Sequence, residues 1–309
     1  QLVRELGRGA HGVVYAARQL SVNRLVAVKV FNHLTASHHR YLQSHILDEI
    51  QTIGRLHHPN IVRIIQADQT PDGRLFYAME LVKGPTLTKL LYDEAPLDPV
   101  RAVNIIRKVL HGLHAAHAAG VIHADVKPDN IAVQQEDEDS VKVDRPVLLD
   151  FGVARLKTKN PNRTSQALGA SAAYMAPEQA FEGVVDVRSD LFTTALVLYE
   201  MLTGWQRAEL GEFVPPLTPN EVRDPHLLGV LRRGLSYDPS QRFQSAREFL
   251  DALVPDAPAG DRADERQNPF RFLAAFTESD RWRFHGRVLA TAQLTDLIVY
   301  NPFVVLVGP

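Results

Sequence analysis

The sequence predicts an α+β fold in which a β-rich first part, to about Val82, precedes a larger α-rich part. Three short strands, Leu2–Leu6, Val13–Arg18 and Leu25–Val30, follow one another closely, and glycines separate the first two. Helical patterns prevail after Val82. With 309 residues, 45% hydrophobic and 23% charged, the chain is long enough for one large domain or two.

Three helices follow from periodicity and from the residues at their ends. A helix is predicted over about 41–56, because apolar residues recur there at steps of three and four. Asp98-Pro99 begins a long helix, with Asp as N-cap and Pro in the first turn, and Gly120 is its expected end. The helix Ser189–Thr203 is apolar on all sides, which predicts a place in the middle of a domain.

Composition excludes several classes of protein. The 34 basic and 36 acidic residues give a net charge of −2, so neither nucleic acid nor a membrane surface is implied as a partner. There is no cysteine, which excludes disulfides and thiolate metal sites and favours a reducing, cytoplasmic compartment. No apolar run approaches about eighteen residues, so no membrane segment is expected in this chain.

A glycine-rich pattern lies between the first two strands. Gly7, Gly9, Gly12 and Val14 match G-x-G-x-x-G-x-V, and glycines allow backbone N–H groups to approach phosphate oxygens. Taken alone, the pattern also fits a plain hairpin turn. Its place between two strands, not between a strand and a helix, disfavours a dinucleotide-binding fold.

A lysine follows in the third strand. Lys29 stands among apolar neighbours, and a buried ammonium group without a partner is costly. Glu49, on the predicted helix that follows, is the expected counter-ion. The glycines and this ion pair together indicate a phosphate-binding site.

Three further motifs follow in a fixed order. His123-Ala124-Asp125-Val126-Lys127-Pro128-Asp129-Asn130 is similar to a kinase catalytic loop, Asp150-Phe151-Gly152 to a magnesium-binding motif, and Ala176-Pro177-Glu178 to the end of an activation segment. Over residues 1–253 the chain therefore resembles the eukaryotic-type (Hanks-type) Ser/Thr protein kinases of bacteria. The resemblance implies a bilobal protein kinase fold over 1–254, with a β-rich N-lobe (about 1–82) and an α-rich C-lobe (about 83–254).

The resemblance also implies ATP and Mg2+ as cofactors and protein Ser/Thr hydroxyls as acceptors. Asp125 would accept the hydroxyl proton, and Lys127 would neutralise the γ-phosphate. Lys29, held by Glu49, would bind the α- and β-phosphates. The implied metal ligands are Asn130 and Asp150. The implied nucleotide-binding residues are Gly7, Gly9, Gly12, Val14, Ala27, Lys29, Met79, Glu80, Val82, Asn130 and Asp150.

Two features depart from the family pattern. Ala124 replaces the Arg that binds an activation-segment phosphate, although Thr164 and Ser165 remain possible sites of autophosphorylation. Acidic residues 136–139 are expected in a solvated hairpin between two strands, with a docking surface as the alternative. By resemblance, Asp190 should anchor the catalytic loop, and Arg242 should pair with Glu178.

The C-terminal part carries a separate pattern. Residues 255–268 lack periodicity and are predicted to be a linker. In residues 269–309, Phe284-His285-Gly286-Arg287 and the apolar run Phe303–Val307 before Gly308 resemble the entry to a P-loop NTPase of the signal-transducing (STAND-like) class. We therefore expect the start of a second domain there.

The leading hypothesis is a Ser/Thr protein kinase coupled to a C-terminal regulatory or sensor NTPase in signalling. An ATP-binding pseudokinase scaffold is the alternative, and the intact Lys29, Asp125, Asn130 and Asp150 speak against it. A small-molecule phosphotransferase of the aminoglycoside type is a third reading. The Ala176-Pro177-Glu178 motif and the long segment before it favour protein acceptors instead.

Overall fold

The computed structural model describes residues 1–9, 12–32, 47, 50–138, 141–151, 173–205 and 217–254, with only the backbone at 137, 138 and 141. Contacts divide the chain into two units, Gln1–Val254 and Pro255–Pro309. The second unit lies outside the described residues, and so do Glu49, Gly152, Thr164 and Ser165. The predictions made for these residues therefore stay predictions.

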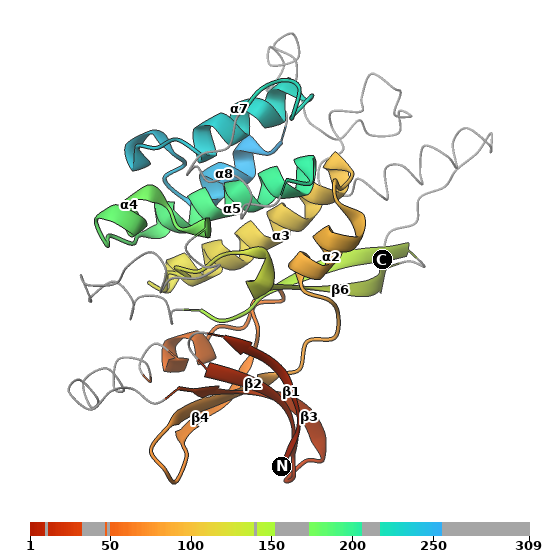
Figure 1. Cartoon of the computed structure of the whole chain (residues 1–309), viewed down its shortest axis with the longest axis vertical. Helices are drawn as coiled ribbons and strands as arrows, with labels where there is room; N and C mark the ends of the chain where they lie inside the picture. Colours follow the sequence, from red (N-terminus) through yellow and green to blue (C-terminus); the bar gives the residue numbers. More distant parts are fainter. Residues whose placement is uncertain are drawn as a thin grey trace, which may run out of the picture. The chain divides into compact units, whose positions relative to one another are not determined.

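The first lobe is built on one antiparallel sheet (Figure 1). Cross-strand pairs place Val14, Lys29 and Tyr77 in one row across three neighbouring strands. The three predicted strands are confirmed, each somewhat longer than expected. In the order β1-β2-β3-β5-β4, the strands are β1 (Leu2–Gly9), β2 (Gly12–Gln19), β3 (Arg24–Phe31), β5 (Leu75–Glu80) and β4 (Ile64–Gln69).

The second lobe is helical and is organised around helix α5 (Figure 1). Every residue of α5 from Ser189 to Met201 is buried, and α3, α7 and α8 pack against this helix. The predicted central position of this helix is confirmed, and so is the bilobal kinase fold. The helices are α2 (Leu87–Glu94), α3 (Pro99–Ala118), α4 (Pro177–Phe181), α5 (Val187–Thr203), α7 (Pro225–Gly234) and α8 (Ala246–Ala252), with 3-10 turns at Pro128–Asn130 and Pro239–Gln241.

Helix α3 begins and ends where the sequence predicts. The Asp98 carboxylate accepts hydrogen bonds from the N–H groups of Val100 (3.0 Å) and Arg101 (3.1 Å), which satisfies two free donors of the first turn. Gly120 follows the last turn with φ +76°. The helix is therefore fixed at both ends beside the loop that follows it.

A two-stranded hairpin, β6 (Ile131–Glu138) and β7 (Val141–Leu148), follows that loop. The predicted hairpin is confirmed and Glu136 is exposed, but residues 136–138 continue strand β6 and do not lie between the two strands. In the ladder Glu136 lies opposite Val143, and its carboxylate forms an ion pair with Arg145, its diagonal neighbour on β7.

This hairpin is hydrogen-bonded at two places to segments outside the second lobe's helices: the segment just before β4 of the first lobe, and the segment after β5 that joins the lobes. At the first, the N–H of Val62 donates to the carbonyl oxygen of Leu148, and Leu148 N–H donates to Asn60 (both 2.9 Å). At the second, Val133 N–H donates to the carbonyl oxygen of Pro85 (2.8 Å). A Cβ on Gly84 would lie 2.2 Å from the Val133 oxygen, so the segment that joins the lobes requires glycine there.

A buried ion pair joins α4 to the end of the second lobe. The Arg242 guanidinium, 0% exposed, donates to both Glu178 oxygens at 2.9 and 2.8 Å. It also donates to the carbonyl oxygens of Ser236 (2.7 Å) and Tyr237 (3.0 Å). The expected partnership of these two residues is confirmed.

Removing one partner of this pair should destabilise the fold strongly. Arg242→Met leaves the Glu178 carboxylate buried without its counter-ion, which costs about 3–5 kcal/mol in urea denaturation. Arg247→Ala is the matched control, since its pair with Asp251 is exposed, and should cost less than about 1 kcal/mol. Equal losses in the two variants would contradict this view of the pair.

Candidate active site

The backbone of the loop at 123–125 is held from the core. Asp190, in the first turn of α5, accepts hydrogen bonds from the N–H groups of His123 (2.9 Å) and Ala124 (2.7 Å). Gln179 on α4 donates to the carbonyl oxygen of Ala124 (2.9 Å). Ala124 has φ +63°, a conformation that costs a non-glycine residue about 1–2 kcal/mol. These three bonds hold it there.

The His123 ring links this loop to the strand that leads to Asp150. Its Nε2 lies 2.8 Å from the Leu149 carbonyl oxygen, and its Nδ1 accepts from the N–H of Asp125 at 3.3 Å. Both contacts are satisfied by a neutral ring that carries its proton on Nε2. Burial lowers the pKa of His123 despite the nearby carboxylates, which keeps the ring neutral.

The three polar residues predicted for the catalytic loop lie together. One oxygen of Asp125, Oδ2, accepts from Lys127 Nζ (2.8 Å) and from Asn130 Nδ2 (3.0 Å). Asn130 Nδ2 also donates to the Asp125 carbonyl oxygen (2.8 Å). Among the described residues no donor reaches Asp125 Oδ1 or Asn130 Oδ1. Both oxygens are therefore available to accept a proton or a cation.

Lys29 of β3 reaches across to Asp150. Its Nζ lies 2.9 Å from Asp150 Oδ2, and the Tyr77 hydroxyl donates to Oδ1 at 2.7 Å. Burial would raise the pKa of Asp150, but the charge of Lys29 and the two hydrogen bonds outweigh it and lower that pKa. Burial and the Asp150 charge raise the pKa of Tyr77 well above its ordinary value. The carboxylate is therefore ionised and the hydroxyl protonated near neutral pH.

The glycines of the first hairpin differ in what they require. At Gly7 and Gly9 an added Cβ would meet nothing within 4 Å, so the space beside them is open. At Gly12 the Cβ would lie 2.2 Å from the Val30 carbonyl oxygen, so packing against β3 already demands glycine. The half-buried Val14 follows on β2.

The segment that joins the lobes offers free backbone groups. Ala27 and Met79 are cross-strand partners and both are buried. The Glu80 N–H donates to the Arg63 carbonyl oxygen (3.0 Å), so this donor is used within the sheet. No hydrogen bond within the described part of the chain involves the backbone of Val82. This residue therefore has a free donor and a free acceptor.

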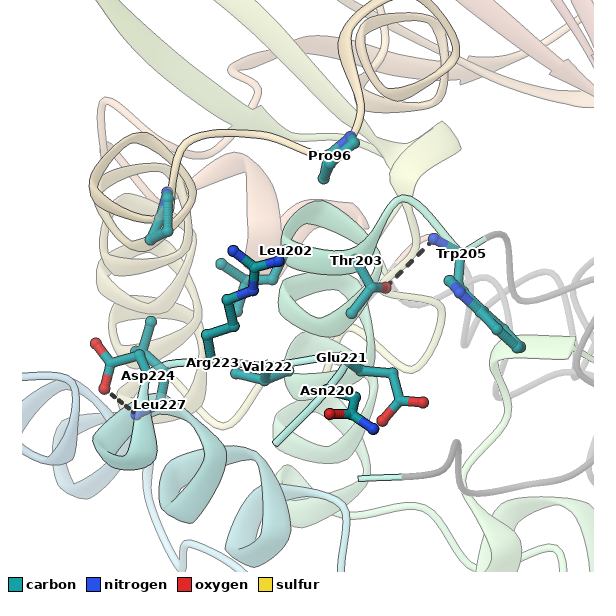
Figure 2. Close-up of a pocket in the computed structure, with 11 residues that line it drawn as sticks. Pro96, Leu202, Thr203, Trp205, Asn220, Glu221, Val222, Arg223, Asp224 and Leu227 are labelled. Atoms are coloured by element: carbon teal, nitrogen blue, oxygen red, sulfur yellow. Dashed lines mark hydrogen bonds between the residues drawn. The ribbon is translucent and has the colours of Figure 1, made fainter. Parts of the chain in front are cut away.

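A separate hollow of about 410 Å3 lies in the second lobe, and Pro96, Leu202, Thr203, Trp205 and Arg223 are among the residues that line it (Figure 2). None of the candidate site residues lines it.

Sequence reasoning missed three residues at the site. Tyr77 lies two residues before Met79 in a strand, so the alternation of side chains should have placed it on the same face. His117, assigned no role, contacts Asp190 at 2.8 Å through Nε2. No local pattern marks His117 or Gln179, because their partners lie 73 and 55 residues away.

Comparison with known proteins agrees with this geometry. The profile of the protein kinase domain matches residues 1–211. The chain belongs to the protein kinase family. The kinase domain of PknI from Mycobacterium tuberculosis, a solved structure, is 30% identical with a TM-score of 0.65, over 82% of this chain and 94% of that one.

Curated relatives are named Ser/Thr-protein kinases. The domain is 36% identical to pkn3 of Myxococcus xanthus over 80% of this chain and 48% of the relative. It is 35% identical to PknB of Mycolicibacterium smegmatis over 82% of this chain and 43% of the relative. The chain thus spans less than half the length of these relatives. Among the described residues, no helix has the length and apolar character needed to cross a bilayer.

The neutral His123 should make the kinase domain sensitive to mild acid. In the folded chain its pKa lies below the ordinary 6.5, so below pH 6.5 the unfolded chain binds more protons. This contribution to stability is complete above pH 6.5 and is lost as the pH falls, by at most about 1.4 kcal/mol per pH unit. Urea denaturation between about pH 7.5 and 5.5 measures it.

His123→Gln, which cannot titrate, should flatten this pH dependence. His58 and His111 should change the stability with pH in the same direction as His123, because burial lowers the pKa of both. A His58→Gln, His111→Gln variant measures their share. The assignment fails if His123→Gln keeps the full slope of the unmodified domain.

Proposed function

We propose that this domain is an ATP-dependent Ser/Thr protein kinase that transfers the γ-phosphate of ATP to protein hydroxyls. The observation that carries the proposal is that the two oxygens of the Asp125 carboxylate have different surroundings. Lys127 and Asn130 bind Oδ2, which fixes the carboxylate, while no donor among the described residues reaches Oδ1 and the side chain is 15% exposed. A carboxylate oriented in this way can accept the proton of an incoming hydroxyl.

The residues present fit ATP and Mg2+. Asp150 and Asn130 offer a carboxylate and an amide oxygen, the hard ligands that Mg2+ prefers. When bound, the cation neutralises charge on the phosphates. The free backbone groups of Val82 can pair with adenine, and the open space beside Gly7 and Gly9 leaves room for phosphate oxygens.

Each charged side chain has a distinct task in this proposal. Lys29 binds the α- and β-phosphates, supported by Glu49 as the sequence predicts. Lys127, beside Asp125, neutralises the γ-phosphate as it moves to the acceptor. Asp125 orients the hydroxyl and takes its proton. Catalysis thus consists of positioning and charge neutralisation, as phosphoryl transfer requires.

The acceptors we propose are Ser and Thr hydroxyls of proteins, in keeping with the names of the relatives. Thr164 and Ser165 are proposed sites of autophosphorylation, and the cytoplasm is the proposed compartment. Ala124 lacks a charge that could bind a phosphate, so we infer that activity does not require phosphorylation of these two residues.

Asp125→Asn tests the proposal. Asn keeps an oxygen for Lys127 and Asn130 but removes the proton acceptor, so kcat should fall by about 100-fold or more. Nucleotide affinity should stay within about threefold, because the metal ligands remain. Transfer of labelled γ-phosphate to a protein acceptor and binding of a fluorescent nucleotide measure the two effects.

Asp93→Asn is the matched control, because this carboxylate is exposed on α2 and pairs only with Lys89 among the described residues. It should leave transfer unchanged. Wild-type transfer rates in Asp125→Asn would refute the assignment.

We also propose that residues 269–309 begin a P-loop NTPase domain that regulates the kinase, after a linker at 255–268. The apolar run Phe303–Val307 before Gly308 supports this, since a run apolar on both faces suits a buried parallel strand. The encoding gene should continue with Gly-Lys-Ser or Gly-Lys-Thr a few residues past Pro309. A polar continuation without that motif would rule the proposal out.

A further inference from the structure

Tyr77 stands beside Lys29 in the sheet. The two residues are directly opposite each other on β5 and β3, so their side chains leave the same face. Tyr77 is only 3% exposed, and its ring lies beside Phe31 with centroids 5.9 Å apart. The ring is therefore held in place by the sheet itself, and its hydroxyl has little freedom to move.

The two side chains together hold one carboxylate. Lys29 Nζ lies 2.9 Å from Oδ2 of Asp150, and the Tyr77 hydroxyl donates a hydrogen bond to Oδ1 at 2.7 Å. Each oxygen thus has its own donor, and the two donors come from neighbouring strands. Asp150 itself has φ +57°, a backbone conformation uncommon for a residue other than glycine.

The two donors differ in what else they can bind. Lys29 is a cation with phosphates to bind in the proposed reaction, so it can leave Asp150 for them. Among the described residues, Asp150 is the only hydrogen-bond partner of the Tyr77 hydroxyl, and a buried hydroxyl left unpaired is unfavourable. The hydroxyl should therefore stay on Asp150 while Lys29 exchanges partners.

We propose that Tyr77 is a positioning residue for the metal–nucleotide site: its hydroxyl fixes the Asp150 carboxylate in the orientation that receives the divalent cation accompanying ATP. The inference rests on the proposed function, because it assigns Asp150 as a metal ligand. A hydrogen-bonded outer partner of this kind orients a ligand without touching the metal.

Tyr77→Phe removes the hydroxyl and keeps the ring. Binding of a fluorescent ADP analogue, titrated with Mg2+, should show a half-saturating Mg2+ concentration raised about 10- to 100-fold. The affinity measured in EDTA should change less than about threefold, because the nucleotide contacts are untouched. At saturating Mg2+, kcat should stay within about threefold of wild type, which separates positioning from catalysis.

Tyr174→Phe is the matched control. Its hydroxyl also donates to a buried carboxylate, that of Glu200, at 2.8 and 3.0 Å, so the same kind of bond is lost away from Asp150. This variant should lose similar thermal stability but keep the wild-type Mg2+ dependence of binding. Tyr77→Met, which lacks the hydroxyl and packs flexibly, is the second variant and should reproduce the loss.

The possible outcomes separate this inference from the proposed function. An Mg2+ dependence within twofold of wild type in Tyr77→Phe, with that dependence lost in Asp150→Asn, overturns the role of Tyr77 alone. No Mg2+ effect on nucleotide binding in the wild type overturns both. An equal shift in Tyr174→Phe means that lost stability is the cause, and this also overturns the inference.

Discussion

The Asp190 carboxylate extends from the core helix α5 and accepts hydrogen bonds from two consecutive backbone N–H groups, those of His123 and Ala124. Asp190 is 1% exposed, so each of these bonds is made to a charge in a low-dielectric setting, where it is worth about 1.5–3 kcal/mol. That is more than the cost of the left-handed backbone at Ala124. The position of Asp125 therefore depends on the Asp190 carboxylate. So do the contacts of the His123 ring and the hydrogen bonds from Lys127 and Asn130 to Asp125.

The conformation of the catalytic loop is thus fixed by buried side chains of the second lobe. The side chain at 124 ends at Cβ, so it can neither donate a hydrogen bond nor carry charge, and the backbone on either side is held by Asp190 and Gln179. The His123 ring adds a connection to Leu149. Between them, these contacts join α4, α5 and the segment between β7 and Asp150.

Much of this arrangement could be predicted from the sequence because its causes are local. The Asp98-Pro99 start of α3 and the apolar length of α5 are local patterns, and the ordered motifs at Asp125 and Asp150 identify the site by resemblance. Contacts between distant residues could not be predicted in this way. The bond from Tyr77 to Asp150 depends on how the lobes meet. The hairpin at the acidic residues could be predicted, but the length of β6 could not, because strands are poor in acidic residues and only pairing with β7 extends this one.

The hairpin β6–β7 is hydrogen-bonded to the first lobe at Val62, beside Leu148, and to the segment joining the lobes at Pro85, beside Val133. A rotation of the first lobe about the line through these two contacts keeps both of them intact. Lys29 and Tyr77 lie on the moving side, whereas Asp125 lies on the fixed side. Rotation about this axis therefore changes the distance between Lys29 and Tyr77 on one side and Asp125 on the other, while the hydrogen bonds of the hairpin stay in place.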